Sequence, residues 1–299
     1  MKTCEKCEIE IPEEFQSPLC LECYREIEIQ NEIKATEEED IKKQEGVVAE
    51  MIANSRNGII DPDYQENTEA EDKPQWMANL AMFEKNGVLL WKPTRQMYTF
   101  IRDYCYSKVT KHPQYPKFVW KPTIVDCCCG TGVGSNVLSE EADFVWGIDK
   151  NEKSIRFAKE AFTRNKSREY YSSQVSFDVI DLMNLNRDTM KFDLVVMIEA
   201  IEHIADYKKL LTTLIQKFDN RRPEEPTEYF ISTPNRNNDS ISKDRPKNSY
   251  HVREWKSQEF YAVLKEFFEN VEFMSAAGEP TTIITNHTPL LAKCSEPKI

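Results

Sequence analysis

The chain has 299 residues, of which 40% are apolar and 11% aromatic. This length fits one large domain, or a catalytic domain with a small appendage, and the apolar content excludes a wholly disordered chain. The formal net charge of −12 is uneven: residues 1–75 hold 8 basic and 21 acidic side chains, and residues 76–299 hold 31 and 30. The acidity therefore belongs to the N-terminal quarter, and the larger part of the chain is neutral.

No apolar run approaches the roughly 18 residues that span a bilayer. The opening MKTCEKCE also lacks the apolar stretch of a secretory signal. The nine cysteines cluster in CxxC pairs and one CCC triplet, a pattern unlike a disulfide framework. We therefore expect a reduced, cytoplasmic protein without a membrane span.

Composition divides the chain into three regions. Residues 1–26 contain the two CxxC pairs, residues 27–75 form an acidic helical arm and a polar linker, and apolar density rises over residues 76–299. In the last region strand-like and helix-like patterns alternate, which predicts a doubly wound, Rossmann-like α/β sheet with helices on both faces. The expected strands are 123–127, 144–148, 175–180, 192–198 and 228–232, with two later β-type runs, and the expected helices are 94–107, 151–165, 207–218 and 257–268.

Four cysteines near the N-terminus form two CxxC pairs that are separated by 12 residues: Cys4, Cys7, Cys20 and Cys23. This spacing is typical of a closed, structural zinc site, and the surrounding residues are too few to form an apolar core without metal. The alternative is redox-active or unrelated thiols. Because the surroundings are acidic, a protein partner suits this module better than a nucleic acid.

Three of the eight glycines follow the strand expected at 123–127, in the segment DCCCGTGVG. They are Gly130, Gly132 and Gly134, with Asp126 at the start of the segment. The G-x-G-x-x-G dinucleotide pattern is not met, because its third glycine would fall at Ser135. An ordinary strand-to-helix turn needs one glycine rather than three, so the cluster indicates a turn built for close approach of a ligand to the backbone.

This acid followed by G-x-G-x-G resembles motif I of the class I S-adenosylmethionine-dependent methyltransferases, with Cys128 at a place where glycine is more usual. The resemblance implies that the glycines shape a turn around S-adenosylmethionine, and that Asp126 faces its amino-acid end. Two later positions also match the family. At the end of FVWGID, Asp149 would hold the ribose, and in VSFDVIDL, Asp181 with Leu182 would hold the adenine. Either acid alone is more simply a solvated residue at a strand end.

Later segments read E-x-x-E-H, S-T-P-N and H-x-x-E-W. Together they resemble the ubiquinone-biosynthesis O-methyltransferases and the small-RNA 3′-terminal 2′-O-methyltransferases. The resemblance implies an acceptor site made of Glu199, Glu202, His203 and His251, which in the RNA-modifying family bind a divalent metal such as Mg²⁺ or Mn²⁺. Ser249 and Arg253 depart from that family's pattern. Alternatively, His203 acts as a general base without metal, or Glu202 and His203 only cap the next helix.

We therefore expect a methyltransferase that modifies an oxygen of a small molecule or a terminal sugar hydroxyl. Two alternatives remain at this point: a nucleic-acid methyltransferase, and a non-catalytic zinc-module binding protein that retains a cofactor fold.

A run of basic residues after the fifth strand would either contact phosphates or be solvated. Cys127, Cys128 and Cys129 are interpreted as small packing residues. The run of basic residues is Arg236, Lys243, Arg245, Lys247 and Arg253.

Overall fold

The computed structural model divides the chain into two compact units, residues 1–60 and 61–299. It describes residues 2–3, 10–11, 92–111, 119–162, 174–186, 188–220, 225–236, 245–246, 248–274 and 289–299. In the first unit, strands β1 (Lys2–Thr3) and β2 (Glu10–Ile11) pair in antiparallel fashion. The four cysteines of the predicted zinc module and the predicted acidic arm lie outside the described residues. Within the described residues, no helix has both the length and the apolarity that crossing a membrane requires.

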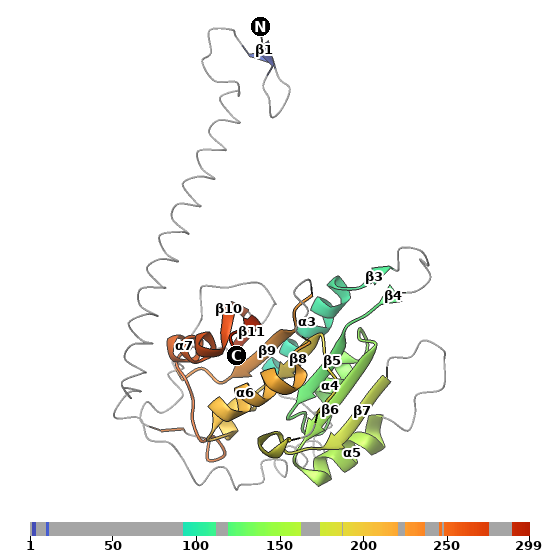
Figure 1. Ribbon diagram of the computed structural model, residues 1–299, viewed down its shortest axis with the longest axis vertical. Helices are drawn as coiled ribbons and strands as arrows, with labels where there is room; N and C mark the ends of the chain where they lie inside the picture. Colours follow the sequence, from blue (N-terminus) through green and yellow to red (C-terminus); the bar gives the residue numbers. More distant parts are fainter. Residues whose placement is uncertain are drawn as a thin grey trace. The chain divides into compact units, whose positions relative to one another are not determined.

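The second unit is built on a seven-stranded sheet with the order β10-β11-β9-β8-β5-β6-β7 (Figure 1). The central strands run parallel, and β10 and β11 form an antiparallel edge. The predicted α/β sheet is thus confirmed, with an edge whose direction the sequence did not predict. The parallel strands are β5 (Thr123–Cys127), β6 (Phe144–Asp149), β7 (Gln174–Val179), β8 (Leu194–Met197) and β9 (Glu228–Thr233), and the edge strands are β10 (Phe268–Met274) and β11 (Leu290–Pro297). A separate hairpin joins β3 (Thr110–Lys111) to β4 (Val119–Trp120).

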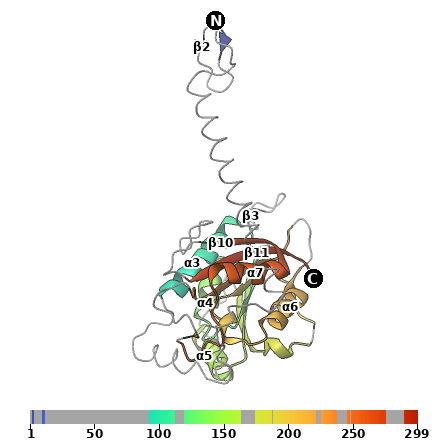
Figure 2. The ribbon, with the colours of Figure 1, turned by 90° about the vertical axis from the view of Figure 1, so that its left-hand side faces the viewer.

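Helices cover both faces of this sheet (Figures 1 and 2). On one face α3 (Lys92–Ser107) and α4 (Val133–Leu138) pack on β5, β6 and β8. The helix α5 (Glu152–Phe162) lies on the same face, because Val175 of β7 packs against the apolar clusters of both α3 and α5. On the other face lie α6 (Tyr207–Phe218) and α7 (Ser257–Phe267).

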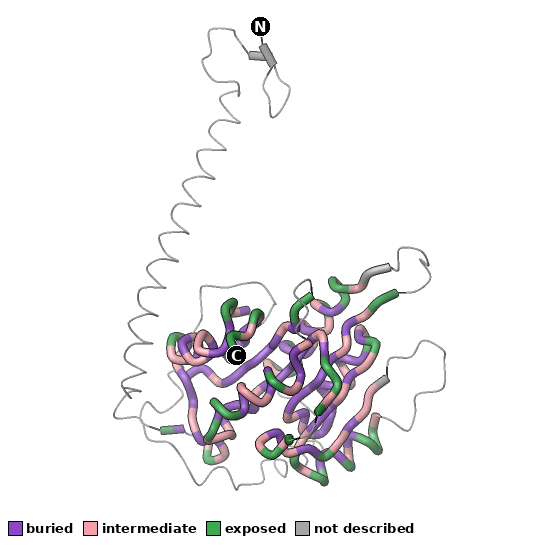
Figure 3. The backbone as a smooth tube through the Cα atoms, viewed as in Figure 1, coloured by how far each residue is buried: buried purple, intermediate pink, exposed green. Residues whose placement is uncertain are grey.

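Sequence patterns explain these elements. In α6 the side chains of Leu210, Leu214 and Phe218 recur every four residues and are fully buried, while Asp206 caps the first turn by accepting a hydrogen bond from the Lys209 N–H at 3.0 Å. The strand β8 is buried along its whole length, as its uninterrupted apolar sequence predicts for an inner parallel strand. Figure 3 shows this buried centre as the purple strands.

The strand order reverses at β5, which pairs with β6 on one side and with β8 on the other. In open α/β sheets, ligands bind outside the carboxyl ends of the strands at such a switch point. The glycine turn follows β5 directly, and the E-x-x-E-H segment follows β8. The topology therefore brings both predicted sites to the same edge of the sheet.

Candidate active site

The turn after β5 uses its glycines for different purposes. Gly130 adopts φ +55° and a Cβ atom added there would meet nothing within 4 Å, so this backbone borders open space. Gly132 adopts φ +77° and a Cβ would lie 2.6 Å from the Phe177 ring. At Gly134 a Cβ would overlap the ring of Tyr98. Only Gly130 therefore leaves room for a ligand, whereas the other two let α5, β7 and α3 pack closely against the turn.

The left-handed backbone at Cys128 explains why glycine is more usual at this position of motif I. Cys128 has φ +59°, a conformation that glycine adopts without cost and that other residues adopt at about 1–2 kcal/mol. Cys127 and Cys129 are buried, and Cys128 packs against the core beside α6 and α7. All three thiols are free, which agrees with the prediction that they fill space.

Asp126 lies beneath the turn and is fully buried. One oxygen of its carboxylate accepts the Tyr98 hydroxyl at 3.0 Å and the other accepts the Ser135 hydroxyl at 2.6 Å. Burial raises the pKa of Asp126 to about 7, although both hydroxyls act in the opposite direction. Both carboxylate oxygens are therefore engaged inside the protein, on the face of the sheet that α3 and α4 cover.

Two further acids lie at neighbouring strand ends. Asp149 ends β6 and accepts hydrogen bonds from the Gly130 N–H at 2.9 Å and the Asn151 N–H at 2.8 Å. This carboxylate is thus held beside the open backbone of Gly130, and burial raises its pKa. Asp181 follows β7 and caps a 3₁₀ turn, η2 (Leu182–Asn184), by accepting the Met183 N–H at 2.9 Å, while Leu182 is buried.

The E-x-x-E-H segment forms a short turn rather than an α-helix. A 3₁₀ turn, η3, covers Ile201–His203, and Glu199 precedes it with φ +53°. The Glu199 carboxylate accepts the Ser232 hydroxyl at 2.8 Å, and that of Glu202 accepts the Thr233 hydroxyl at 3.2 Å. Neither Glu202 nor His203 caps the next helix, because Asp206 fills that position.

Glu202, His203 and His251 nonetheless converge, since one potential ligand atom from each lies within 4.8 Å of the others. The Nδ1–H of His203 donates to the Tyr250 carbonyl at 2.6 Å, which fixes the tautomer and leaves the lone pair on Nε2, 3.7 Å from the nearer oxygen of Glu202. The rings of His203 and His251 meet edge to face with centroids 4.8 Å apart. Three of the four predicted acceptor-site residues thus share one cluster.

Partners around His251 orient its ring. Its Nδ1 lies 2.6 Å from the carboxylate of Glu254, and its Nε2 lies 2.8 Å from the side-chain amide of Asn248. Because a carboxylate only accepts, Nδ1 carries the proton and the lone pair of Nε2 faces the amide. A carboxylate behind an imidazole is the arrangement that commonly orients a histidine metal ligand.

Burial dominates the electrostatics of the cluster. It raises the pKa of Glu202, and the neighbouring Glu199 raises it further. Burial together with His251 lowers the pKa of His203 to about 4, so this imidazole is neutral at pH 7. A neutral imidazole beside buried carboxylates is a set of electron-pair donors that fits a divalent cation.

Two of the described members of the basic run after β9 are engaged in contacts with other side chains. Arg236 is buried and pairs with Glu259. The guanidinium of Arg253 lies over the rings of Tyr207 and Trp255, at 4.8 and 5.7 Å from their centroids. Arg245 is exposed, and Lys243 and Lys247 lie outside the described residues.

Some contributors to the site were not identified from the sequence. Tyr98 lies in α3, far from any motif, and Ser135 was noted only as a residue that breaks the dinucleotide pattern. Asn248 and Tyr250 orient the two histidines, but an amide and a backbone carbonyl carry no recognisable spacing. Only Glu254 was signalled, through the H-x-x-E-W segment.

Comparison with known proteins identifies the domain. A family profile described as a methyltransferase domain matches residues 121–274, which is more than half of the chain. A probable S-adenosylmethionine-dependent methyltransferase of Mycolicibacterium smegmatis is 26% identical over 142 residues, covering 48% of this chain and 49% of that protein. A ubiquinone biosynthesis O-methyltransferase of Coxiella burnetii is 25% identical over 114 residues, covering 38% and 44%. The chain thus spans about half the length of these curated relatives.

A solved structure shares the fold. The plantazolicin methyltransferase BpumL, determined in complex with S-adenosylhomocysteine, superposes with a TM-score of 0.52 at 16% identity and covers 84% of this chain and 99% of that one. The chain belongs to the methyltransferase-domain family and has a Rossmann-like α/β fold.

Proposed function

We propose that the protein transfers the methyl group of S-adenosylmethionine to an oxygen of its acceptor, either a small molecule or a terminal sugar hydroxyl. Membership in the methyltransferase family supports the transfer, and relatives named as ubiquinone biosynthesis O-methyltransferases favour oxygen and a small acceptor. The observation that carries the acceptor site is the convergence of Glu202, His203 and His251 at the carboxyl ends of the strands.

The cofactor site fits the chemistry of an adenosyl group. Asp149, held beside the open backbone at Gly130, offers acceptor oxygens to a pair of ribose hydroxyls. Asp181 and Leu182 lie after the next strand, where the adenine would be bound. The buried Asp126 links the turn to α3 and α4 through its two hydrogen bonds, and Gly132 and Gly134 let neighbouring side chains pack against the turn. When bound, S-adenosylmethionine supplies a methyl group that is activated by the positive sulfonium.

The acceptor residues would hold a divalent cation, Mg²⁺ or Mn²⁺. The Glu202 carboxylate is 1% exposed, its contacts among the described residues include the Thr233 hydroxyl and the neutral His203, and the neighbouring charges of Glu199 and Glu254 are negative. A buried carboxylate without a charged partner is costly, and a cation would offset that cost. His203 would complete the site, with Glu199 beside it. His251 would join as a ligand through Nε2 if the cation replaced the Asn248 amide, which that nitrogen accepts in the structure.

Neutral His203 is a poor general base at pH 7, because its pKa is lowered to about 4. A residue with that pKa accepts a proton only weakly, yet it keeps the Nε2 lone pair that a metal ligand needs. We therefore assign the residues of the cluster to binding and orienting the acceptor hydroxyl. Orientation is the main contribution that methyl transfer requires from the protein.

Binding of Mn²⁺, followed by electron paramagnetic resonance, tests the acceptor site. The wild-type chain should bind the ion, and Glu202→Gln should weaken binding at least tenfold because it removes one charged ligand. Glu225→Gln, which changes an exposed glutamate, is the matched control and should bind Mn²⁺ as the wild type does. Equal binding by Glu202→Gln and the wild type would remove the cation from the proposal.

The acceptor class is tested by incubating the chain with methyl-labelled S-adenosylmethionine and a fractionated cell extract. Label should enter the small-molecule fraction as an oxygen-linked methyl group. Label on a terminal sugar hydroxyl would agree with the second form of the proposal, whereas label elsewhere in RNA or DNA would establish the nucleic-acid alternative. Methylation of nitrogen would contradict an oxygen acceptor.

The predicted N-terminal zinc module belongs to this proposal as the part that recruits a protein partner. Its support is the spacing of Cys4, Cys7, Cys20 and Cys23 in the sequence. Elemental analysis should find one zinc per chain, and Cys7→Ser should lower that content. Zinc that is absent from the purified wild-type chain would contradict it.

A further inference from the structure

A tyrosine that precedes the matched domain contacts both ends of the glycine turn. Tyr98 lies in α3 and is 4% exposed. Its hydroxyl donates to Asp126, before the turn, and its ring occupies the space next to Gly134, after the turn. The side chain of Tyr98 therefore contacts the residue before the turn and the glycine at its end.

The hydroxyl of Tyr98 matters because the groups around Asp126 are neutral or negative. The negative charge of Asp149, at the end of β6, raises the pKa of Asp126, and the buried thiols of Cys127 and Cys129 lie near Asp126. Against these, the carboxylate has the hydroxyls of Tyr98 and Ser135, one on each oxygen. Each of them donates a hydrogen bond to the carboxylate, which favours its charged form.

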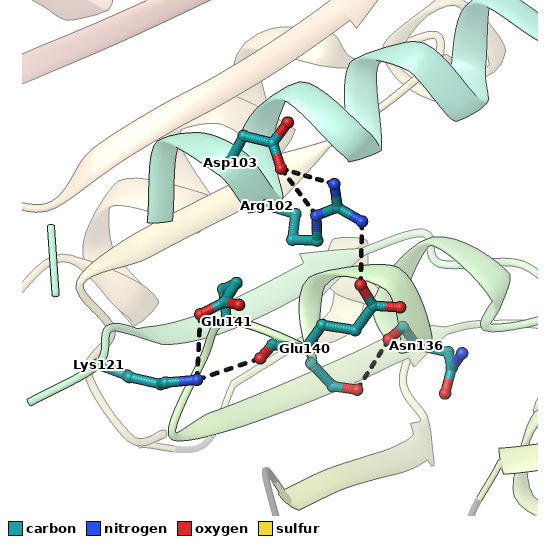
Figure 4. A network of polar contacts seen from close by, with 7 residues as sticks. Arg102, Asp103, Lys121, Asn136, Glu140 and Glu141 are labelled. Atoms are coloured by element: carbon teal, nitrogen blue, oxygen red, sulfur yellow. Dashed lines mark hydrogen bonds and ion pairs between the residues drawn. The ribbon is translucent and has the colours of Figure 1, made fainter. Parts of the chain in front are cut away.

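Contacts that do not involve this hydroxyl hold α3 in place. Met97 and Ile101 are buried in the core on either side of it. Figure 4 shows Arg102 reaching from α3 to Glu140, just after α4, at 3.0 Å. Removing the hydroxyl should therefore leave α3 in place and alter only the support of Asp126.

We propose that Tyr98 is a positioning residue for the methyl donor. Through its hydrogen bond to the Asp126 carboxylate, Tyr98 holds the glycine turn in the conformation that binds the donor. This inference rests on the proposed cofactor site at the turn. Tyr98 has no contact with the donor in this assignment, because its hydroxyl is used by Asp126. Its effect should therefore disappear when the carboxylate is absent.

Calorimetric titration with S-adenosylhomocysteine tests this through four chains: the wild type, Tyr98→Phe, Asp126→Ala and the double variant. Tyr98→Phe keeps the ring and should weaken binding at least threefold. In the Asp126→Ala background, which has no side-chain acceptor for the hydroxyl, the same change should weaken binding by less than twofold. Tyr104→Phe is the matched control: it removes a hydroxyl of the same helix that donates to Glu228 at 2.6 Å, away from the turn, and should bind within twofold of the wild type.

Three results would overturn the proposal: a loss below threefold for Tyr98→Phe, equal losses for Tyr98→Phe and Tyr104→Phe, or the full Tyr98→Phe loss persisting in the Asp126→Ala background. If Tyr98→Phe folds poorly, Ser135→Ala removes the donor to the other oxygen and is judged by the same thresholds. Failure of the wild-type chain to bind S-adenosylhomocysteine is a different result, which would overturn the proposed function itself.

Discussion

Replacing Asp126 by asparagine should stabilise the protein increasingly as the pH rises. Burial raises the pKa of the Asp126 carboxyl to about 7 from its ordinary value of 3.8. Between those values the folded chain retains a proton that the unfolded chain has lost, so the free energy of unfolding falls by about 1.4 kcal/mol per pH unit. Above pH 7 both states are ionised and the accumulated loss levels off at about 4 kcal/mol. Asparagine cannot ionise, so the variant escapes this loss.

Urea denaturation of the two chains at pH 5, 6, 7 and 8.5 measures the effect. The difference in free energy of unfolding, variant minus wild type, should increase up to about pH 7 and then remain constant. Its value at low pH depends on how well the amide accepts the Tyr98 and Ser135 hydroxyls, but its increase with pH does not. A difference that stays constant between pH 5 and 8.5 would refute the reasoning, because it would mean that the carboxyl does not titrate inside the fold.

Other changes should be equally informative. Gly134→Ala places a methyl group in the space of the Tyr98 ring and should lower the free energy of unfolding by about 1–3 kcal/mol in urea denaturation; a stability equal to the wild type would contradict this packing. Metal removal with EDTA should lower the melting temperature and added Mn²⁺ should restore it, since an ion that binds only the folded chain stabilises it by about 3 kcal/mol at one hundred times its dissociation constant. The Mn²⁺ effect should be lost in Glu202→Gln, and an undiminished effect would place the ion elsewhere.

Much of the fold could be predicted because its signals are local. The strands β5, β6, β8 and β9 and the helices α6 and α7 agree with the predicted ranges to within two residues, since each combines a regular apolar pattern with clear ends. The two late strands, β10 and β11, were expected, but their antiparallel direction was not, because a strand's direction is set by partners distant in sequence. The small hairpin of β3 and β4 was missed because each of its strands has only two residues, too few to show an apolar pattern.

The placement of Asp149, Glu202 and His203 beside strand ends could be predicted, because each follows a clear apolar strand. Their roles in binding stay predictions. Prediction failed where the contact depends on three-dimensional placement. Tyr98 meets Asp126 across 28 positions of sequence, and no pattern in α3 signals this. Arg236 read as a surface cation, yet it is buried against Glu259.

The most direct test of the account is calorimetric titration of the wild-type chain and Asp149→Ala with S-adenosylhomocysteine. Asp149 is held beside Gly130 by two backbone hydrogen bonds, so its carboxylate is in place to accept the ribose hydroxyls. The wild type should bind, and Asp149→Ala should bind at least tenfold more weakly because charged hydrogen bonds are lost. The control Asp143→Ala, which removes an exposed carboxylate just before the same strand, should bind as the wild type does. Equal binding by Asp149→Ala and the wild type, or no binding by the wild type, would contradict the account.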